Sequence, residues 1–141
     1  MDEKKLQTLL DRMDIVDTSI RYATGVDMRD WEIYRSCFTD ELEVDFTGTP
    51  ETQKADDWVN TARQLVSPYT ATQHIITNHN ITIEGDEATC IAYLQAQHYR
   101  SDDTGVSALT VGGYYTNKLV RSPEGWKISK LKLTITWTLN S

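Results

Sequence analysis

A chain of 141 residues, 39% hydrophobic and 25% charged, is long enough to form one domain over residues 1–141 and is not composed like a disordered protein. Its formal net charge of −7 argues against nucleic-acid binding, because phosphate recognition needs clustered Lys and Arg side chains. The first residues lack the apolar core of a signal peptide, and no apolar run approaches the roughly 20 residues that cross a bilayer, so we expect a cytoplasmic protein that does not bind membranes.

The first predicted element is an amphipathic helix from Glu3 to about Thr24, which Gly25 is expected to end. Apolar residues recur along it with the period of a helix. They predict one stripe that packs against a core, formed by Leu6, Leu9, Leu10, Met13, Val16 and Ile20.

Two shorter helices follow, with a strand between them. The first is predicted over about 30–38, with Asp27 or Asp30 as its N-cap. Residues 41–46 alternate in polarity, which is typical of a strand, and a turn comes next. The third helix is predicted over about 55–66, with an inward face formed by Trp58, Ala62 and Leu65.

The rest of the chain predicts four strands, over residues 73–84, 87–100, 107–121 and 126–139. Short connections between successive strands favour antiparallel pairing. Helices followed by such a meander predict an α+β fold, in which N-terminal helices pack on a strongly curved, mainly antiparallel sheet. A bent sheet closed at one end by helices would leave a cone-shaped cavity.

Two histidines are candidates for that cavity. The strand over 88–98 has one apolar face that ends in His98, and an imidazole there needs a hydrogen-bond partner or a wet cavity. His74 is in phase with Asn78, which predicts a polar inner wall on that strand, whereas His79 is out of phase. Both candidates could equally be ordinary core or rim histidines.

Proton transfer is the chemistry that suits these residue types. A histidine whose pKa lies near neutral pH becomes a better base when a carboxylate accepts a hydrogen bond from its other ring nitrogen. Asp27 or Asp30 could supply that carboxylate. As far as the pattern goes, both aspartates could also be helix caps. Nucleotide-binding, serine-hydrolase and zinc-protease motifs are absent, and the histidines lack a metal-ligand spacing, so we predict neither a metal nor a cofactor.

Aromatic residues are further candidates for lining the cavity. They are Tyr34, Trp58, Tyr114 and Tyr115. Because Tyr114 and Tyr115 are adjacent on one predicted strand, at most one of them should face inward. Core packing is the alternative for each of these side chains.

Three segments together resemble a known family: RYATGVDMRDWEIYRSCFTDELEVDF, QHIITNHNITIEGDEATCIAYLQAQHY and YYTNKLVRSPEGWKISKL. They resemble the SnoaL-like branch of the nuclear transport factor 2-like superfamily. Within it they are similar to the group of scytalone dehydratase, the bile-acid 7α-dehydratases and hexachlorocyclohexane dehydrochlorinase. The resemblance covers nearly the whole chain and implies a cone-shaped α+β barrel with a deep pocket.

The resemblance also implies roles for individual residues. It places a His–Asp dyad at His74 and Asp27, leaves Asp30 as a helix cap, and adds Tyr22 and His98 as partners in catalysis. The dehydrochlorinase has lysine where Tyr22 stands, which argues against that particular reaction here.

The function expected from this resemblance is a cofactor-independent lyase. We expect a dehydratase that acts on an apolar cyclic substrate, steroid-like or polyketide-like. The alternatives are an isomerase built from the same parts and a non-catalytic small-molecule binding module. The family resemblance also favours a homodimer or homotrimer.

Overall fold

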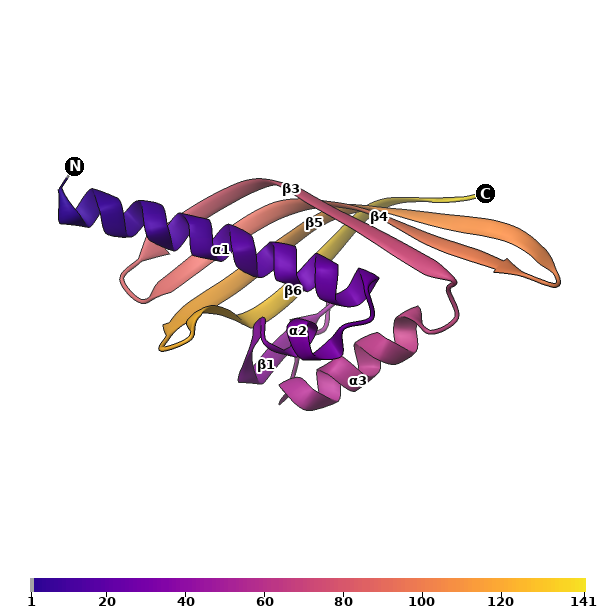
Figure 1. Ribbon diagram of the computed structural model, residues 1–141, viewed down its shortest axis with the longest axis horizontal. Helices are drawn as coiled ribbons and strands as arrows, with labels where there is room; N and C mark the ends of the chain where they lie inside the picture. The colour runs from indigo at the N-terminus through magenta and orange to yellow at the C-terminus, as the bar shows by residue number, and fades with distance from the viewer. Residues whose placement is uncertain (1) are drawn as a thin grey trace.

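The computed structural model describes residues 2–141 and has three helices and six strands (Figure 1). The helices are α1 (Glu3–Asp27), α2 (Trp31–Arg35) and α3 (Ala55–Val66). The strands are β1 (Phe38–Asp45), β2 (Glu51–Lys54), β3 (Ala71–Glu84), β4 (Glu87–Asp102), β5 (Gly105–Ser122) and β6 (Gly125–Asn140). Within residues 2–141, no helix is both long and apolar enough to cross a membrane.

The strands form one mixed sheet in the order β2-β1-β6-β5-β4-β3, with β1 and β6 parallel and every other pair antiparallel. Gly85 and Gly125 adopt a left-handed backbone in the β3–β4 and β5–β6 turns, where other residues would be strained. Figure 1 shows the long strands curving over the helices. The predicted α+β fold is confirmed, although the sheet stays open and does not close into a barrel.

Helix α1 does not pack through its predicted apolar stripe. The large side chains of that stripe are 45–57% exposed, namely Leu6, Leu9, Leu10, Met13 and Ile20. The buried face is partly polar instead, because Asp11 binds the Arg121 guanidinium and Thr18 donates to the carbonyl of Trp126. The predicted orientation of α1 was therefore wrong: polar contacts to the β5–β6 hairpin, together with Ile15 and Tyr22, set the buried face.

Gly25 lies inside α1 and does not end it. A Cβ atom at this position would lie 2.7–2.9 Å from the backbone nitrogen, Cα and Cβ of Tyr34 in α2. Glycine is therefore needed because the two helices approach each other closely. Helix α1 continues to Asp27, and Arg29 follows with φ of +57°.

The remaining elements lie close to their predicted ranges, with local differences. Helix α2 is shorter than predicted, and its N-cap is Asp30, whose carboxylate accepts from the Ile33 N–H at 3.1 Å. Helix α3 spans the predicted residues, with Trp58 buried but Leu65 56% exposed. The short strand β2 was not predicted.

A bulge divides strand β3. The pairing of β3 with β4 shifts between Thr77 and Asn80, and Asn78 has φ of +56°. Asn78 is exposed as a result, so the prediction that it forms an inner wall was wrong. The bulge instead directs His79 toward α1, where its Nε2 lies 2.6 Å from Ser19 Oγ.

Candidate active site

An apolar pocket of about 210 Å³ lies between the helices and the inner face of the sheet. Most of its walls are aliphatic or aromatic. Among the predicted site residues, it is lined by Tyr22, Tyr34, Trp58, His74, His98 and Tyr115. The fold thus brings α1, α2 and α3 together with strands β3 to β5 around one cavity.

Asp27 and His74 are in direct contact beside this pocket. The Nδ1 atom of His74 lies 2.7 Å from Oδ1 of Asp27, and the backbone N–H of His74 donates to Oδ2 at 2.7 Å. Asp27 comes from the last residue of α1 and His74 from the start of β3, 47 residues later. Asp30 is the helix cap, so Asp27 is free to bind the histidine.

The contacts of Asp27 determine which ring nitrogen of His74 carries the proton. An ionised carboxylate only accepts hydrogen bonds, so the Nδ1 atom of His74 must donate to it. In the neutral imidazole Nε2 is then the unprotonated atom, available as a base. The side chains of His74 and Asp27 are only 10% and 20% exposed, which keeps this pair largely shielded from water.

His98 occupies a different environment in the same pocket. Its Nδ1 donates to the carbonyl of Leu109 at 3.2 Å, and its ring centroid lies 5.8 Å from that of His74 and 5.1 Å from that of Tyr69. Burial lowers the pKa of His98 below its usual value, and the positive charge that His74 can carry lowers it further. His98 is therefore mostly neutral at neutral pH.

Three buried phenols and an indole form a polar cluster within the aromatic wall. The Tyr115 hydroxyl donates to the Tyr22 hydroxyl at 3.2 Å, and the Trp58 Nε1–H donates to the Tyr34 hydroxyl at 3.0 Å. Burial raises the pKa of Tyr22, Tyr34 and Tyr115 well above the ordinary phenol value. These groups therefore stay protonated and act as hydrogen-bond donors.

Two predicted residues lie outside the pocket, and others were missed. Tyr114 is on the opposite face of β5 from Tyr115, and Asn78 is exposed. Two residues at the site were not predicted from the sequence. Thr72 donates to Asp27 at 3.0 Å, and Tyr69 packs on His98. Strand alternation could have indicated Thr72, since it shares a face with His74.

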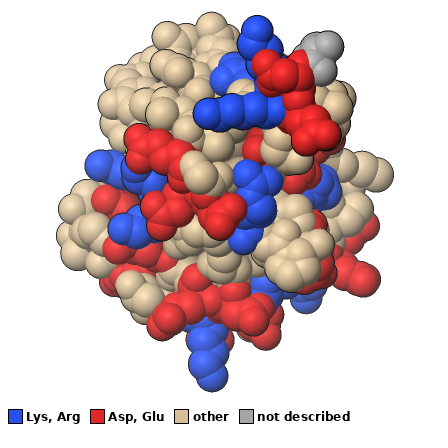
Figure 2. Space-filling model, turned by 90° about the vertical axis from the view of Figure 1, so that its left-hand side faces the viewer, with Lys and Arg blue, Asp and Glu red and all other residues tan. Residues whose placement is uncertain are grey.

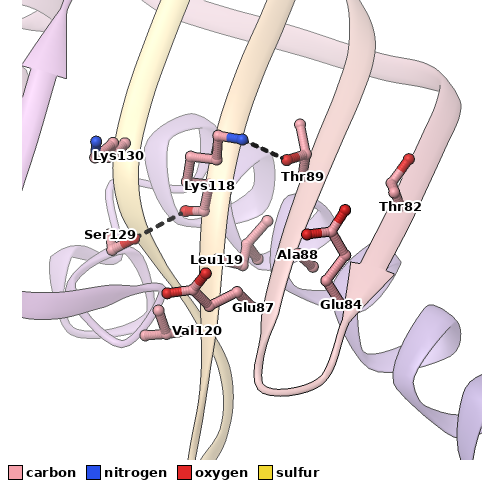
Figure 3. Close-up of a pocket in the computed structure, with 10 residues that line it drawn as sticks. All are labelled: Thr82, Glu84, Glu87, Ala88, Thr89, Lys118, Leu119, Val120, Ser129 and Lys130. Atoms are coloured by element: carbon pink, nitrogen blue, oxygen red, sulfur yellow. Dashed lines mark hydrogen bonds between the residues drawn. The ribbon is translucent and has the colours of Figure 1, made fainter.

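The charged surface that residues 2–141 present carries a second hollow of a different kind. Figure 2 shows acidic and basic side chains interspersed over the face in view, without a continuous basic patch. A second hollow of about 260 Å³ lies on the sheet, with the helices behind the strands in Figure 3. It mixes Lys118 and Lys130 with Glu84 and Glu87 and contains no histidine.

Within residues 2–141, no three His, Cys, Asp or Glu side chains gather as a metal site would require.

Comparisons with known proteins agree with this fold. The structure of Kfla4162 from Kribbella flavida is 33% identical, covers 94% of this chain and 95% of that one, and superposes with a TM-score of 0.88. A scytalone dehydratase-like protein from Novosphingobium aromaticivorans is 21% identical over 94% and 88% of the two chains, with a TM-score of 0.83. Terrestric acid biosynthesis cluster protein E of Penicillium crustosum is 28% identical over 92% and 85%.

A family model also matches most of the sequence. The model of the SnoaL-like domain aligns with residues 7–132, a range that includes the dyad, His98 and Tyr115. This range runs from the first helix into the last strand of the sheet. The chain therefore belongs to the family of SnoaL-like domains.

Proposed function

We propose that this protein is a cofactor-independent lyase, a dehydratase that acts on an apolar cyclic hydroxy ketone. The observation that carries the proposal is the 2.7 Å contact between His74 and Asp27 at a mostly apolar pocket. The likeness to a scytalone dehydratase-like protein and membership of the SnoaL-like family support the reaction class.

His74 acts as the base in this proposal. Its Nε2 removes a proton from the carbon next to the substrate carbonyl, and the electron pair of that C–H bond moves toward the carbonyl oxygen. The pair then forms the new carbon–carbon double bond while the bond to the hydroxyl group on the next carbon breaks. Asp27 stabilises the imidazolium that His74 becomes and holds its ring orientation.

Tyr22 and His98 assist the two oxygen atoms of the substrate. Tyr22, backed by Tyr115, donates a hydrogen bond to the carbonyl oxygen as negative charge develops there. The protonated form of His98 donates a proton from Nε2 to the departing hydroxyl, which leaves as water, and the proton that His74 has taken up replaces it through the solvent. Because the pKa of His98 is lowered, its protonated form is a stronger acid than an ordinary imidazolium.

The size of the cavity narrows the substrate class. A volume of about 210 Å³ is below the roughly 300–1,000 Å³ of pockets that enclose drug-sized ligands. A one- or two-ring polyketide-like ketone therefore fits better than a whole steroid. A longer substrate would extend into the adjoining mouth of about 390 Å³, which shares Tyr69, His98 and Leu109 with the pocket.

Self-association belongs to the same proposal. The outer face of the sheet exposes apolar side chains, among them Ile75, Tyr93 and Trp137, at 45–57%. Such a face is well suited to a second copy of the chain because its other residues include uncharged glutamines. Light scattering of the purified protein counts the chains in the particle, and a monomer would contradict the proposed self-association.

The cytoplasmic location stays a prediction that fractionation of the source cells tests.

The test is turnover of cyclic β-hydroxy ketones, measured as enone absorbance in deuterated water. Wild type should eliminate water, and His74→Ala and Asp27→Asn should each lower the rate by at least about 100-fold because the base is lost or misoriented. His79→Gln is the matched control: this histidine is on the same strand but binds Ser19, so the rate should stay at the wild-type level.

Three other outcomes identify the alternatives. Deuterium next to the carbonyl without loss of water would make the protein an isomerase with the same base. Binding of these compounds without any reaction in wild type would make it a binding module. Equal turnover by wild type and His74→Ala would remove the dyad from the reaction.

A further inference from the structure

Arg29 lies directly behind the dyad, between the end of α1 and the start of β3. Its Nη1 donates to the carbonyl of Val26 at 2.7 Å and to Thr72 Oγ1 at 2.8 Å, and its Nη2 donates to the carbonyl of Val66 at 3.4 Å. Its φ of +57° is in the left-handed region, which residues other than glycine adopt rarely. The guanidinium contacts thus compensate an unfavourable backbone conformation next to Asp27.

The hydrogen bond from Arg29 dictates the orientation of the Thr72 hydroxyl. A guanidinium only donates, so the Thr72 oxygen accepts from it. The single hydroxyl proton of Thr72 is then left for Asp27, whose Oδ1 lies 3.0 Å away. Thr72 is 8% exposed, which leaves little access for water to replace either partner.

Asp27 consequently receives three hydrogen bonds from strand β3. Its Oδ1 accepts from the Thr72 hydroxyl and from His74 Nδ1, while its Oδ2 accepts from the backbone N–H of His74. A carboxylate held at both oxygens cannot rotate freely, so it presents a fixed acceptor to the imidazole. Without Thr72, the side-chain hydrogen bond from His74 would be the only one left at Oδ1.

We propose that Arg29 and Thr72 are positioning residues that hold Asp27 and thereby keep His74 protonated on Nδ1. Neither residue lines the pocket, so neither is a catalytic residue. The effect on catalysis rests on the proposed function, whereas the effect on the histidine does not. Arg29 orients the Thr72 hydroxyl, and the hydroxyl proton then binds the carboxylate of Asp27 and holds it in place.

The test is nitrogen NMR of the His74 ring in substrate-free protein, with Thr72→Val and Thr72→Ser as a matched pair. Valine has nearly the same shape as threonine but lacks the hydroxyl, whereas serine keeps it. Wild type and Thr72→Ser should show the Nδ1–H form of neutral His74, and Thr72→Val should add a measurable population of the Nε2–H form. Arg29→Met, which removes the donors that orient the hydroxyl, should shift His74 in the same direction.

Activity supplies a second readout once a substrate is known. Thr72→Val should lower kcat roughly tenfold or more with KM little changed, because it disturbs the base rather than the pocket, and Thr72→Ser should restore it. An unchanged His74 tautomer in folded Thr72→Val would overturn the proposal. A shifted tautomer in a protein that turns over none of the ketones would refute the proposed function while leaving the positioning role intact.

Discussion

His74 and His98 line the same pocket, but their hydrogen-bond partners differ in charge. His74 donates from Nδ1 to the carboxylate of Asp27, which fixes the orientation of its ring. His98 donates from Nδ1 to the uncharged carbonyl of Leu109 and is partly buried, which favours its neutral form. Two side chains of the same type thus lie in different electrostatic surroundings within one pocket.

The lowered pKa of His98 predicts how stability changes with pH. The groups around it are His74, Asp27 and Arg29. Because the folded protein binds the His98 proton less tightly than the unfolded chain does, stability is retained above the unfolded pKa of about 6.5 and falls as the pH drops below it. The loss continues until the pH reaches the lower, folded pKa.

Urea unfolding at pH 7.5 and pH 5.0 measures this effect. Wild type should lose more unfolding free energy between the two pH values than His98→Gln does, since glutamine does not titrate. Proton NMR of the wild-type imidazole should give His98 a pKa below about 6.5. A pKa at or above that value would show that the neutral form is not favoured.

Helix α1 is held on the β5–β6 hairpin by an ion pair that hydrophobic periodicity could not reveal. The Asp11 carboxylate accepts two hydrogen bonds from Arg121 and one from the Trp126 indole at 3.0 Å. Hydrogen bonding to Arg121 lowers the pKa of Asp11 to about 2. The contribution of Asp11 to stability is therefore present above about pH 4 and is lost as the pH falls toward 2.

Replacing Asp11 should be far more costly than replacing an exposed partner of another arginine. Asp11→Ala should lower the unfolding free energy by about 2–4 kcal/mol, because it leaves the Trp126 indole without its acceptor and takes from Arg121 its buried carboxylate partner, so that only Asp86 and the Gly85 carbonyl still accept from it. Asp56→Ala removes an exposed carboxylate from Arg35 and should cost at most about 1 kcal/mol. Urea denaturation of both variants compares them, and equal losses would mean that the Asp11 pair does not anchor α1.

The helices and long strands were predictable because their periodicity and turn residues are local signals. The orientation of α1 was not, since its apolar stripe has the correct period but its buried face is decided by Arg121 and Trp126, more than 100 residues away. Gly25 looked like a helix end, although the reason for it is the backbone of Tyr34. The bulge at Asn78 changed the inward face of β3 without any strong sign in the sequence.

The fold assembles the candidate site from segments that are far apart in the sequence. Tyr22 and Asp27 come from the C-terminal part of α1, whereas His74, His98 and Tyr115 come from three successive strands. The family resemblance pairs Asp27 with His74, and the two side chains lie within hydrogen-bond reach, while their roles in catalysis stay a prediction. It did not anticipate Thr72 and Arg29, because their role depends on side-chain geometry rather than on a motif.

In the proposed reaction, His74, held by Asp27, removes a proton next to a carbonyl. Deuterium exchange of a ketone without a leaving group tests that step alone, and 1-tetralone has a two-ring size suited to the cavity. In deuterated buffer, mass spectrometry should show wild type and His79→Gln exchanging the hydrogens next to the carbonyl faster than buffer, while His74→Ala and Asp27→Asn exchange at the buffer rate. Exchange by His74→Ala as fast as wild type, or none by wild type with the ketone bound, would contradict the proposed role of His74 as the base.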